Sequence, residues 1–300
     1  MIELVLCTLI WGASFIAQKT GADHFGPFSI GCFRNLVAGM FLWCCICLRN
    51  RVSRRCPPPP STSTSVFIGG ALSGLCVFAA ELAQQLGIER TSPGVSAFLT
   101  ANYVLLVPVF GIALGRRAGF AVWSGVILAL FGTYFICHPA SSSSLFPLPF
   151  SLGPGEAGTL LCAAFFAVQI LVVDRFARNC DMLRFSMVQV TVAGFVALPF
   201  VFLPSELART DWGDFTAGLP TLLFLGIFVS GVSYALQNHG QAKVSAALAA
   251  IIMSLEGVFA VFFGWLILGD VLTVRQLFGC AFVFGAVILS QIFSRSDAKI

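Results

Sequence analysis

The sequence predicts an all-α integral membrane protein with ten transmembrane helices, arranged as two inverted repeats of five helices. Three observations predict this fold: the composition, the spacing of the apolar runs and an internal repeat. Of the 300 residues, 58% are hydrophobic and 10% are charged, whereas soluble domains average about 45–50% apolar and about 25% charged residues. Because so few charges cannot cover a water-facing surface, we expect the protein to lie in a lipid bilayer.

Ten apolar runs approach the length of about 20 residues that a membrane-spanning helix needs. Hydropathy locates these runs, and polar, Gly and Pro residues set their ends. No basic segment or cleavage signature accompanies the first run, so we interpret it as a span and not as a signal peptide. The predicted helices cover residues 3–21, 27–48, 66–88, 92–114 and 119–138 in the first half, and 155–175, 183–204, 217–238, 244–268 and 273–293 in the second.

The connections between the runs are rich in charged, Gly, Pro and Ser residues, which is why each run ends where it does. The longest connections are the Arg- and Pro-rich 49–65 and the Ser- and Pro-rich 139–154, and the segment SELARTDWGD (205–214) is acidic. The connection at 139–154 lies at the middle of the chain and has the composition of a linker. It divides the chain into domains at 1–138 and 155–293, followed by a tail at 294–300.

The distribution of basic residues predicts the orientation. Ten spans place both termini on one side, and if that side is the cytosol it receives twelve Lys and Arg residues against three outside. The twelve are Arg49, Arg51, Arg54, Arg55, Arg116, Arg117, Arg175, Arg178, Arg184, Lys243, Arg295 and Lys299; the three are Arg90, Arg209 and Arg275. Because cytosolic loops carry an excess of Lys and Arg, we expect both termini in the cytosol.

The chain also repeats internally. RNLVAG (34–39) matches QVTVAG (189–194), and residues 87–111 match residues 240–264, at offsets of 155 and 153 residues. Each copy holds an odd number of spans, so the second copy must enter the membrane from the opposite side. Inverted repeats of this kind recur in secondary transporters, whose substrate sites lie near the middle of the membrane between the repeats.

The repeat aligns polar positions inside apolar spans. Glu81 falls on Tyr234, Gln84 on Gln237, Gln85 on Asn238, and Tyr103 on Glu256. Residues four apart share a helix face, so the pairs 81/85 and 234/238 each present one polar face. A pseudo-twofold axis would direct both faces into a common cavity, with Tyr103 and Glu256 opening onto it.

An ionised side chain at the centre of a membrane helix costs roughly 2.5–3.5 kcal/mol on the lenient insertion scale, so such residues persist where they face the protein interior, a partner or water. Two interpretations are open for Glu81 and Glu256. Either carboxylate serves a substrate or an exchangeable proton, or it is a packing residue that hydrogen-bonds between helices.

Three motifs give the sequence a resemblance to a known family. WGASFIAQK (11–19), the Arg34 to Ala38 step in the second span, and SLEGVFAVFFGWLILGDVLT (254–273) resemble the EamA domain of the drug/metabolite transporter superfamily. The resemblance extends over nearly the whole chain as two domains, although Glu256-Gly257 stands where the family usually has Glu-Pro. It implies a plasma (inner) membrane secondary transporter of small organic metabolites, often amino acids and frequently as an exporter.

Further polar residues complete the predicted cavity. Lys19 matches a cation of the family, and two roles are open for it: attracting a carboxylate or snorkelling to the interface. Arg34 lies too deep for snorkelling, and it either holds a substrate anion or pairs with an internal carboxylate such as Glu81. The complete predicted lining is Trp11, Lys19, Arg34, Glu81, Gln85, Asn102, Tyr103, Gln169, Tyr234, Asn238 and Glu256.

Several functional classes lack their motifs. The sequence contains no HExxH, nucleophile elbow or phosphate-cradling loop, so we expect neither an enzyme nor ATP-driven transport by this chain alone. We expect no cofactor, metal site or nucleic-acid partner. The eleven cysteines, such as Cys44, Cys45 and Cys47, have neither zinc-site nor disulfide spacing, so we interpret them as small buried hydrophobic residues.

The expected partners are therefore the bilayer, a small-molecule substrate, and protons or another coupling ion. The leading hypothesis is a metabolite transporter that works by alternating access. The alternative within transport is a proton-coupled exporter of drugs or organic cations, in which Glu81 or Glu256 exchanges protons. A membrane protein without transport activity is the third hypothesis, and the matched polar pairs argue against it.

Overall fold

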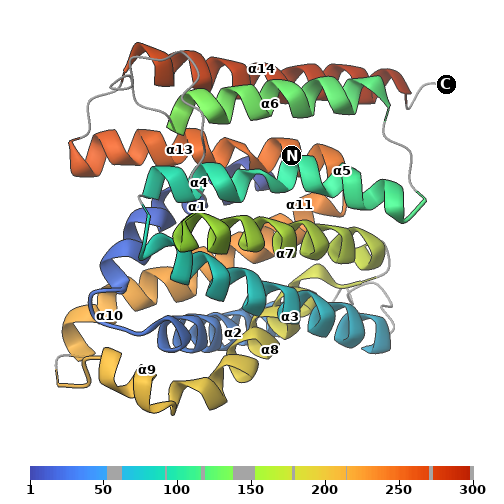
Figure 1. Cartoon of the computed structure of the whole chain (residues 1–300). Helices are drawn as coiled ribbons and strands as arrows, with labels where there is room; N and C mark the ends of the chain where they lie inside the picture. Colours follow the sequence, from blue (N-terminus) through green and yellow to red (C-terminus); the bar gives the residue numbers. More distant parts are fainter. Residues whose placement is uncertain are drawn as a thin grey trace.

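The computed structural model describes residues 1–52, 63–91, 93–115, 119–137, 153–177, 180–213, 215–269 and 273–297. All regular structure in these ranges is helical, and helices lie in every range that the sequence predicts (Figure 1). Seven helical runs are long and apolar enough to cross a membrane, and three shorter apolar helices lie at Leu99–Ala113, Val122–Phe135 and Leu277–Leu289.

The helices of the first half are α1 (Ile2–Gly21), α2 (Pro27–Val52), α3 (Ser63–Ile88), α4 (Pro93–Ala101), α5 (Tyr103–Ala113) and α6 (Phe120–Cys137). Those of the second half are α7 (Pro154–Phe176), α8 (Met182–Val201), α9 (Pro204–Arg209), α10 (Phe215–Leu223), η2 (Phe224–Val232), α11 (Ser233–Gln241), α12 (Ala246–Met253), α13 (Leu255–Phe263), η3 (Gly264–Leu268) and α14 (Val274–Asp297). The π-helical η2 joins α10 to α11 without a gap.

Two predicted helices are interrupted in their middle. The run predicted at 92–114 breaks at Asn102 between α4 and α5, and the run predicted at 244–268 breaks at Ser254 between α12 and α13. Pro108 lies inside α5, beyond the first break, and removes one backbone hydrogen-bond donor there. At the second break the Ser254 hydroxyl donates to the Ile251 carbonyl (2.7 Å), which competes with the helical hydrogen bonds.

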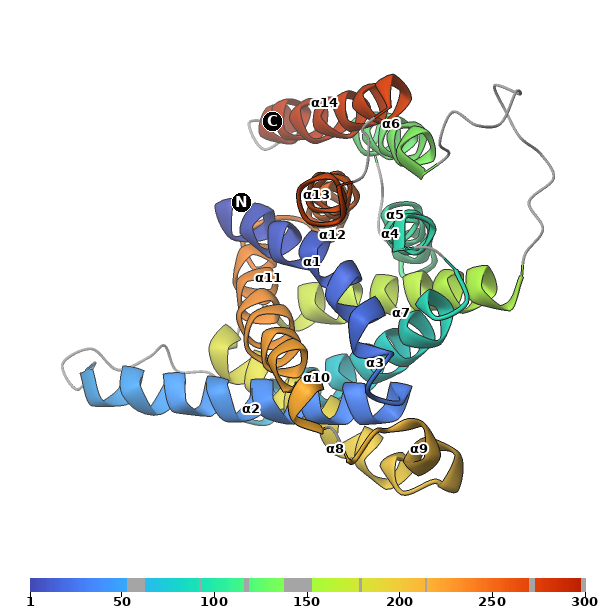
Figure 2. The same cartoon turned by 90° about the vertical axis from the view of Figure 1, so that its left-hand side faces the viewer.

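The two halves of the chain interleave. α3 packs along α7 and α8, α2 along α8, α1 along α11 and α13, and α6 along α14 (Figures 1 and 2). Glycines allow the close approach of α3 to α8, because a Cβ on Gly70 or Gly74 would meet the side chain of Val188 or the carbonyl of Gln189. The GxxxG step of the third span is therefore a packing motif, as its spacing indicates.

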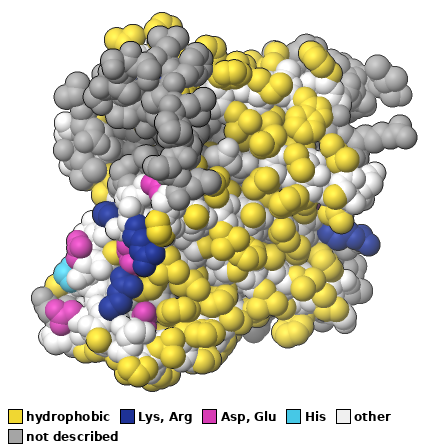
Figure 3. Space-filling model, in the orientation of Figure 1, with side chains coloured by type: hydrophobic (Ala, Val, Ile, Leu, Met, Phe, Trp, Pro, Cys, Tyr) yellow, Lys and Arg dark blue, Asp and Glu magenta, His cyan; other side chains and the backbone are white. Residues whose placement is uncertain are grey.

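The outer surface is apolar. Met40, Trp43, Phe67 and Phe120 are exposed, and hydrophobic side chains cover most of the described face in Figure 3, with charged side chains gathered towards its edges. Such a surface suits lipid, because large exposed apolar patches are rare on soluble monomers.

The cysteine cluster of α2 differs from its prediction. Cys44 is exposed and Cys45 and Cys47 are partly exposed, so these side chains lie on the outer face and are not buried inside the protein. The sequence could not separate the two environments, because a thiol that faces lipid and a thiol that faces a protein core both occur in apolar runs. Among the described residues no group of His, Cys, Asp and Glu could hold a metal ion.

Candidate functional site

A narrow cavity lies at the centre of the bundle, and both halves of the chain supply its walls. Its volume of about 30 Å³ has room for roughly two water molecules. Its lining is Trp11, Ser14, Phe15, Gln18, Arg34, Glu81, Gln84, Thr100, Tyr103, Phe166, Gln169, Ile170, Val229, Tyr234, Gln237, Met253 and Glu256. The cavity is much smaller than a metabolite, so a substrate can enter only if the surrounding helices move.

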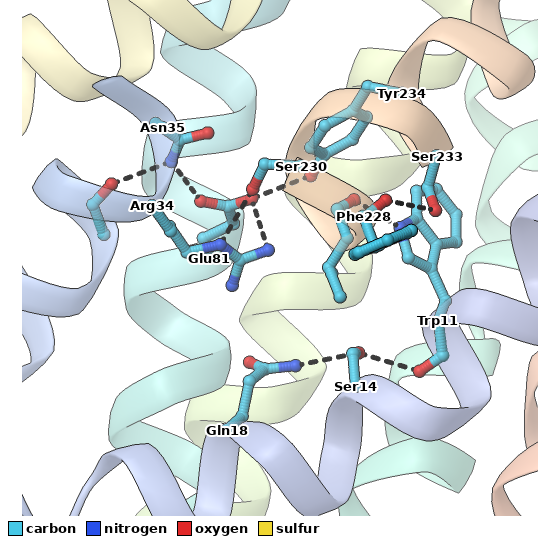
Figure 4. A network of polar contacts seen from close by, with 12 residues as sticks. Trp11, Ser14, Gln18, Arg34, Asn35, Glu81, Phe228, Ser230, Ser233 and Tyr234 are labelled. Carbon is cyan, nitrogen blue, oxygen red and sulfur yellow. Dashed lines mark hydrogen bonds and ion pairs between the residues drawn. The ribbon is translucent and has the colours of Figure 1, made fainter. Parts of the chain in front are cut away.

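An ion pair forms one wall of the cavity (Figure 4). Arg34 on α2 places Nη2 3.1 Å from Oε1 of Glu81 on α3, and both side chains are about 95% buried. The Nε of Arg34 donates to the hydroxyl of Ser230 on η2 (2.9 Å). Arg34 lies inside the bundle, as its sequence position indicates, and Glu81 balances its charge there.

Glu81 accepts further hydrogen bonds from both halves of the chain. The hydroxyl of Tyr234 on α11 donates to Oε1 (3.0 Å), and Nδ2 of Asn35 donates to Oε2 (2.6 Å). These donors and Arg34 all stabilise the ionised carboxylate. The hydrogen bond with Tyr234 joins two positions that the internal repeat aligns with each other, one on α3 and one on α11.

A second polar row follows α1. The Ser14 hydroxyl donates to the carbonyl of Trp11 (2.7 Å) and accepts from Nε2 of Gln18 (3.2 Å) (Figure 4). The indole nitrogen of Trp11 donates to the carbonyl of Val229 on η2 (3.3 Å), and the indole ring packs edge-on to Tyr234 with centroids 5.6 Å apart. This row therefore ties α1 to the second half of the chain.

The cavity lining also holds polar atoms that lack partners. Oε1 of Glu256 and Oε1 of Gln18 are buried without a hydrogen bond. Glu256 lies in the first turn of α13, close to the helix interruption at Ser254. Unpartnered buried polar groups are costly, and they recur where a ligand or water completes the site.

Seven predicted lining residues lie on the cavity: Trp11, Arg34, Glu81, Tyr103, Gln169, Tyr234 and Glu256. The other four do not. Lys19 donates to the carbonyls of Ile88 (2.9 Å) and Glu89 (3.3 Å) at one end of the bundle, and Nδ2 of Asn102 donates to the carbonyl of Leu99.

Gln85 and Asn238 contact neighbouring helices outside the cavity. Nε2 of Gln85 donates to the carbonyl of Gln18, and Nδ2 of Asn238 donates to Ser186 and Gln189 on α8 (2.8 Å each). The residues that face the cavity beside Glu81 and Tyr234 are instead those three positions later in the chain, Gln84 and Gln237.

Those residues are Gln84 and Gln237, which the internal repeat aligned but which the sequence analysis left out of the lining. Residues three and four apart share a helix face equally well, so the spacing alone could not choose between them. Ser14 and Gln18 were missed as well, although they stand three and seven positions after Trp11 on one stripe of α1.

Amide side chains extend from the cavity along α7 and α11. Nε2 of Gln237 donates to Oε1 of Gln169 (3.1 Å) and lies 3.5 Å from Oε1 of Gln241, whose own Nε2 donates to the carbonyl of Ile170. The row leads from the cavity towards the end of the bundle where α11 ends.

Ion pairs join the two halves at both ends of the bundle. At the end where α1 begins, Glu3 contacts Lys243 and His239, and Arg49 contacts Asp181. At the end where α1 and α3 finish, Arg209 lies 2.7 Å from Glu89. Among the described residues, ion pairs between the two halves therefore lie at each end of the bundle.

Comparison with known proteins agrees with this architecture. The model of the EamA-like transporter family matches residues 1–137 and 153–291. A crystal structure of another protein has the same fold, with a TM-score of 0.73 and 18% identity over 98% of this chain and 97% of that one.

Relatives occur in archaea, bacteria and plants. An uncharacterized transporter of Archaeoglobus fulgidus is 28% identical over 95% of this chain and 83% of its own length. The chloroplastic WAT1-related protein At3g02690 of Arabidopsis thaliana is 27% identical over 93% of this chain and 66% of its own. The S-adenosylmethionine/S-adenosylhomocysteine transporter of Chlamydia trachomatis is 23% identical over 93% of this chain and 85% of its own. With a family model that spans both halves of the sequence, the chain belongs to the EamA-like transporter family.

Proposed function

We propose that the chain is a secondary transporter that exports small organic metabolites, such as amino acids and related compounds, across the plasma membrane. Its ten spans form two inverted repeats, at 1–138 and 155–293, with both termini in the cytosol. The repeats move against each other, so that the central cavity opens to one side of the membrane at a time.

One observation carries this proposal: a polar cavity at the centre of an apolar bundle is walled by both halves of the chain, and ion pairs join the halves at both ends of the bundle. Arg34 and Glu81 come from the first half, and Tyr234 and Ser230 from the second. Buried charges in a membrane protein are costly unless they serve a pathway or a pairing partner. The ion pairs at the two ends supply contacts that alternating access would break in turn.

The test is transport by the purified protein in liposomes. Vesicles that contain the protein and are loaded with an unlabelled metabolite extract should take up labelled metabolites from outside by exchange, whereas protein-free vesicles should not. No uptake of any component above the protein-free control would contradict the proposal.

Alternating access has its own test at the two ends. In a variant without native cysteines, one cysteine pair replaces Glu3 and Lys243 and another replaces Glu89 and Arg209. Cross-linking either pair should stop transport, because each end must open in every cycle, and cleaving the cross-link should restore it. The single-cysteine variants are the control. Transport that persists with one end locked would rule out this mechanism.

A proton-coupled multidrug exporter is the second candidate, and the buried carboxylate of Glu256 favours it because such a group can carry a proton. A pH gradient across the vesicle membrane separates the two. It should drive uphill movement of unrelated hydrophobic drugs in a proton-coupled exporter, and it should not do so in a metabolite exchanger.

A further inference from the structure

The described lining of the cavity has more acidic side chains than basic ones. Among its described lining residues Arg34 is the one basic side chain, and Glu81 and Glu256 are the two acidic ones. Arg34 and Glu81 neutralise each other at 3.1 Å. Glu256 is left with no cation near it, and only 3% of its surface is exposed.

Two acceptor atoms that line the same cavity have no donor. They are Oε1 of Glu256 and Oε1 of Gln18. A group with several N–H donors and a positive charge would satisfy these atoms together. A carboxylate would not, because it brings no N–H donor to these acceptor atoms.

The rest of the cavity wall is aromatic. Trp11, Phe15 and Phe166 line it together with the two tyrosines, and the rings of Trp11 and Phe166 lie 6.4 Å apart between centroids. Aromatic faces attract cations and also pack against an apolar body. The same cavity thus offers one carboxylate for a charged group and several rings for the remainder of a ligand.

From these observations we infer that the transported metabolites carry a protonated amine, which binds to the carboxylate of Glu256 and the side-chain oxygen of Gln18, with the carbon skeleton against Trp11 and Phe166. The inference rests on the proposed function, because it names the substrate class of the same central site. It also assigns unequal roles to the two buried carboxylates: Glu81 holds the helices together and Glu256 recognises the substrate.

The experiment compares ligands that share a skeleton and differ in one group. Phenethylamine, phenylalanine, phenethyl alcohol and 3-phenylpropionate form one series, and hexylamine, hexanol and hexanoate form another. Each compound competes with labelled metabolite exchange in the liposomes described above. Phenethylamine and hexylamine should inhibit the exchange at concentrations roughly 10- to 100-fold lower than the matching alcohols, as expected for a charge-assisted hydrogen bond.

The matched variants are Glu256→Gln and Glu89→Gln. Glu256→Gln keeps the side-chain volume and removes the charge, so the amines should lose their advantage over the alcohols. Its thermal stability without ligand should equal or exceed that of the wild type, since the carboxyl oxygen Oε1 that it replaces makes no hydrogen bond. Glu89→Gln makes the same change at the end of the bundle and should leave the preference for amines intact.

Three results would overturn the inference. The first is a wild type that prefers the acids or the alcohols, and the second is a Glu256→Gln protein that still prefers amines, which would be expected if Glu256 only exchanged protons. The third is metabolite exchange that no amine of either series inhibits, which would refute the substrate class while leaving the transport function intact. If the liposomes exchange no metabolite at all, the proposed function itself fails.

Discussion

Replacing Glu81 by Gln should strongly destabilise the folded protein. The carboxylate of Glu81 is the anionic partner of Arg34, and it accepts hydrogen bonds from Asn35 and Tyr234. A Gln side chain fills the same volume, but it leaves the guanidinium of Arg34 as a buried charge whose remaining hydrogen-bond partner is Ser230.

Removing one partner of a buried ion pair costs about 3–5 kcal/mol, because the other charge is left uncompensated. At roughly 2–4 °C per kcal/mol, this corresponds to a decrease of roughly 6–20 °C in the melting temperature. The double variant Arg34→Gln with Glu81→Gln removes both charges and should recover a large part of that loss.

The assay is thermal unfolding in detergent, followed by the fraction of protein that remains monodisperse after heating. Glu89→Gln is the control, because its partner Arg209 is exposed at 45% of its side chain and exposed pairs contribute about 0–1 kcal/mol. If Glu81→Gln melts no lower than Glu89→Gln, or if the double variant is less stable than Glu81→Gln, the ion pair is not the interaction that holds these helices together.

Three further predictions test the packing, the pH dependence and the topology. Gly74→Leu should abolish the folded protein, because a side chain there would collide with the backbone of α8; wild-type yield and melting temperature would contradict this. Burial works to raise the pKa of Asp181, but its hydrogen bonds with Arg49 and its interactions with the start of α8 outweigh burial and lower that pKa below its ordinary value of 3.8. The pKa of Asp181 is thus lower in the folded state than in the unfolded state, so its ionised carboxylate stabilises the fold fully above pH 3.8. This stabilisation is lost as the pH falls through the folded-state pKa. Asp181→Asn keeps a good helix cap but should cost about 1 kcal/mol of stability at neutral pH. The difference in melting temperature between this variant and the wild type should shrink on acidification. A difference that stays constant with pH would show that the charge of Asp181 does not stabilise the fold. A reporter fused after Pro58 should be cytosolic and one within 141–144 external, and both on one side would refute the inverted repeats.

Much of the fold could be predicted from the sequence because the membrane imposes a simple rule on it. Runs of about 20 apolar residues must be helices there, so the ranges of the helices followed directly. The interruptions at Asn102 and Ser254 could not be predicted from the sequence, since the residues around them are compatible with both a continuous and a broken helix. Neighbouring helices decide between the two.

The candidate site was predictable where the internal repeat was informative. Aligning the halves paired Glu81 with Tyr234, and these side chains are in contact. The alignment could not decide which of Gln84 and Gln85 faces the cavity, because that depends on how α3 is rotated against its neighbours. The alignment of the halves could not identify Asn35 as a polar site residue, since its aligned partner in the second half is the apolar Val190.

The interleaving of the halves has a consequence for how the protein is made. Ribosomes deliver the first half to the membrane before the second exists, and at that stage Arg34 lacks Ser230 and Glu81 lacks Tyr234. The early helices also lack α7 and α8, against which α3 packs (Figure 1). Biogenesis must therefore hold five loosely associated helices in the membrane until synthesis passes the linker. A chain that stops there would present an unfinished polar core to the lipid, and quality-control proteases could recognise it by that core.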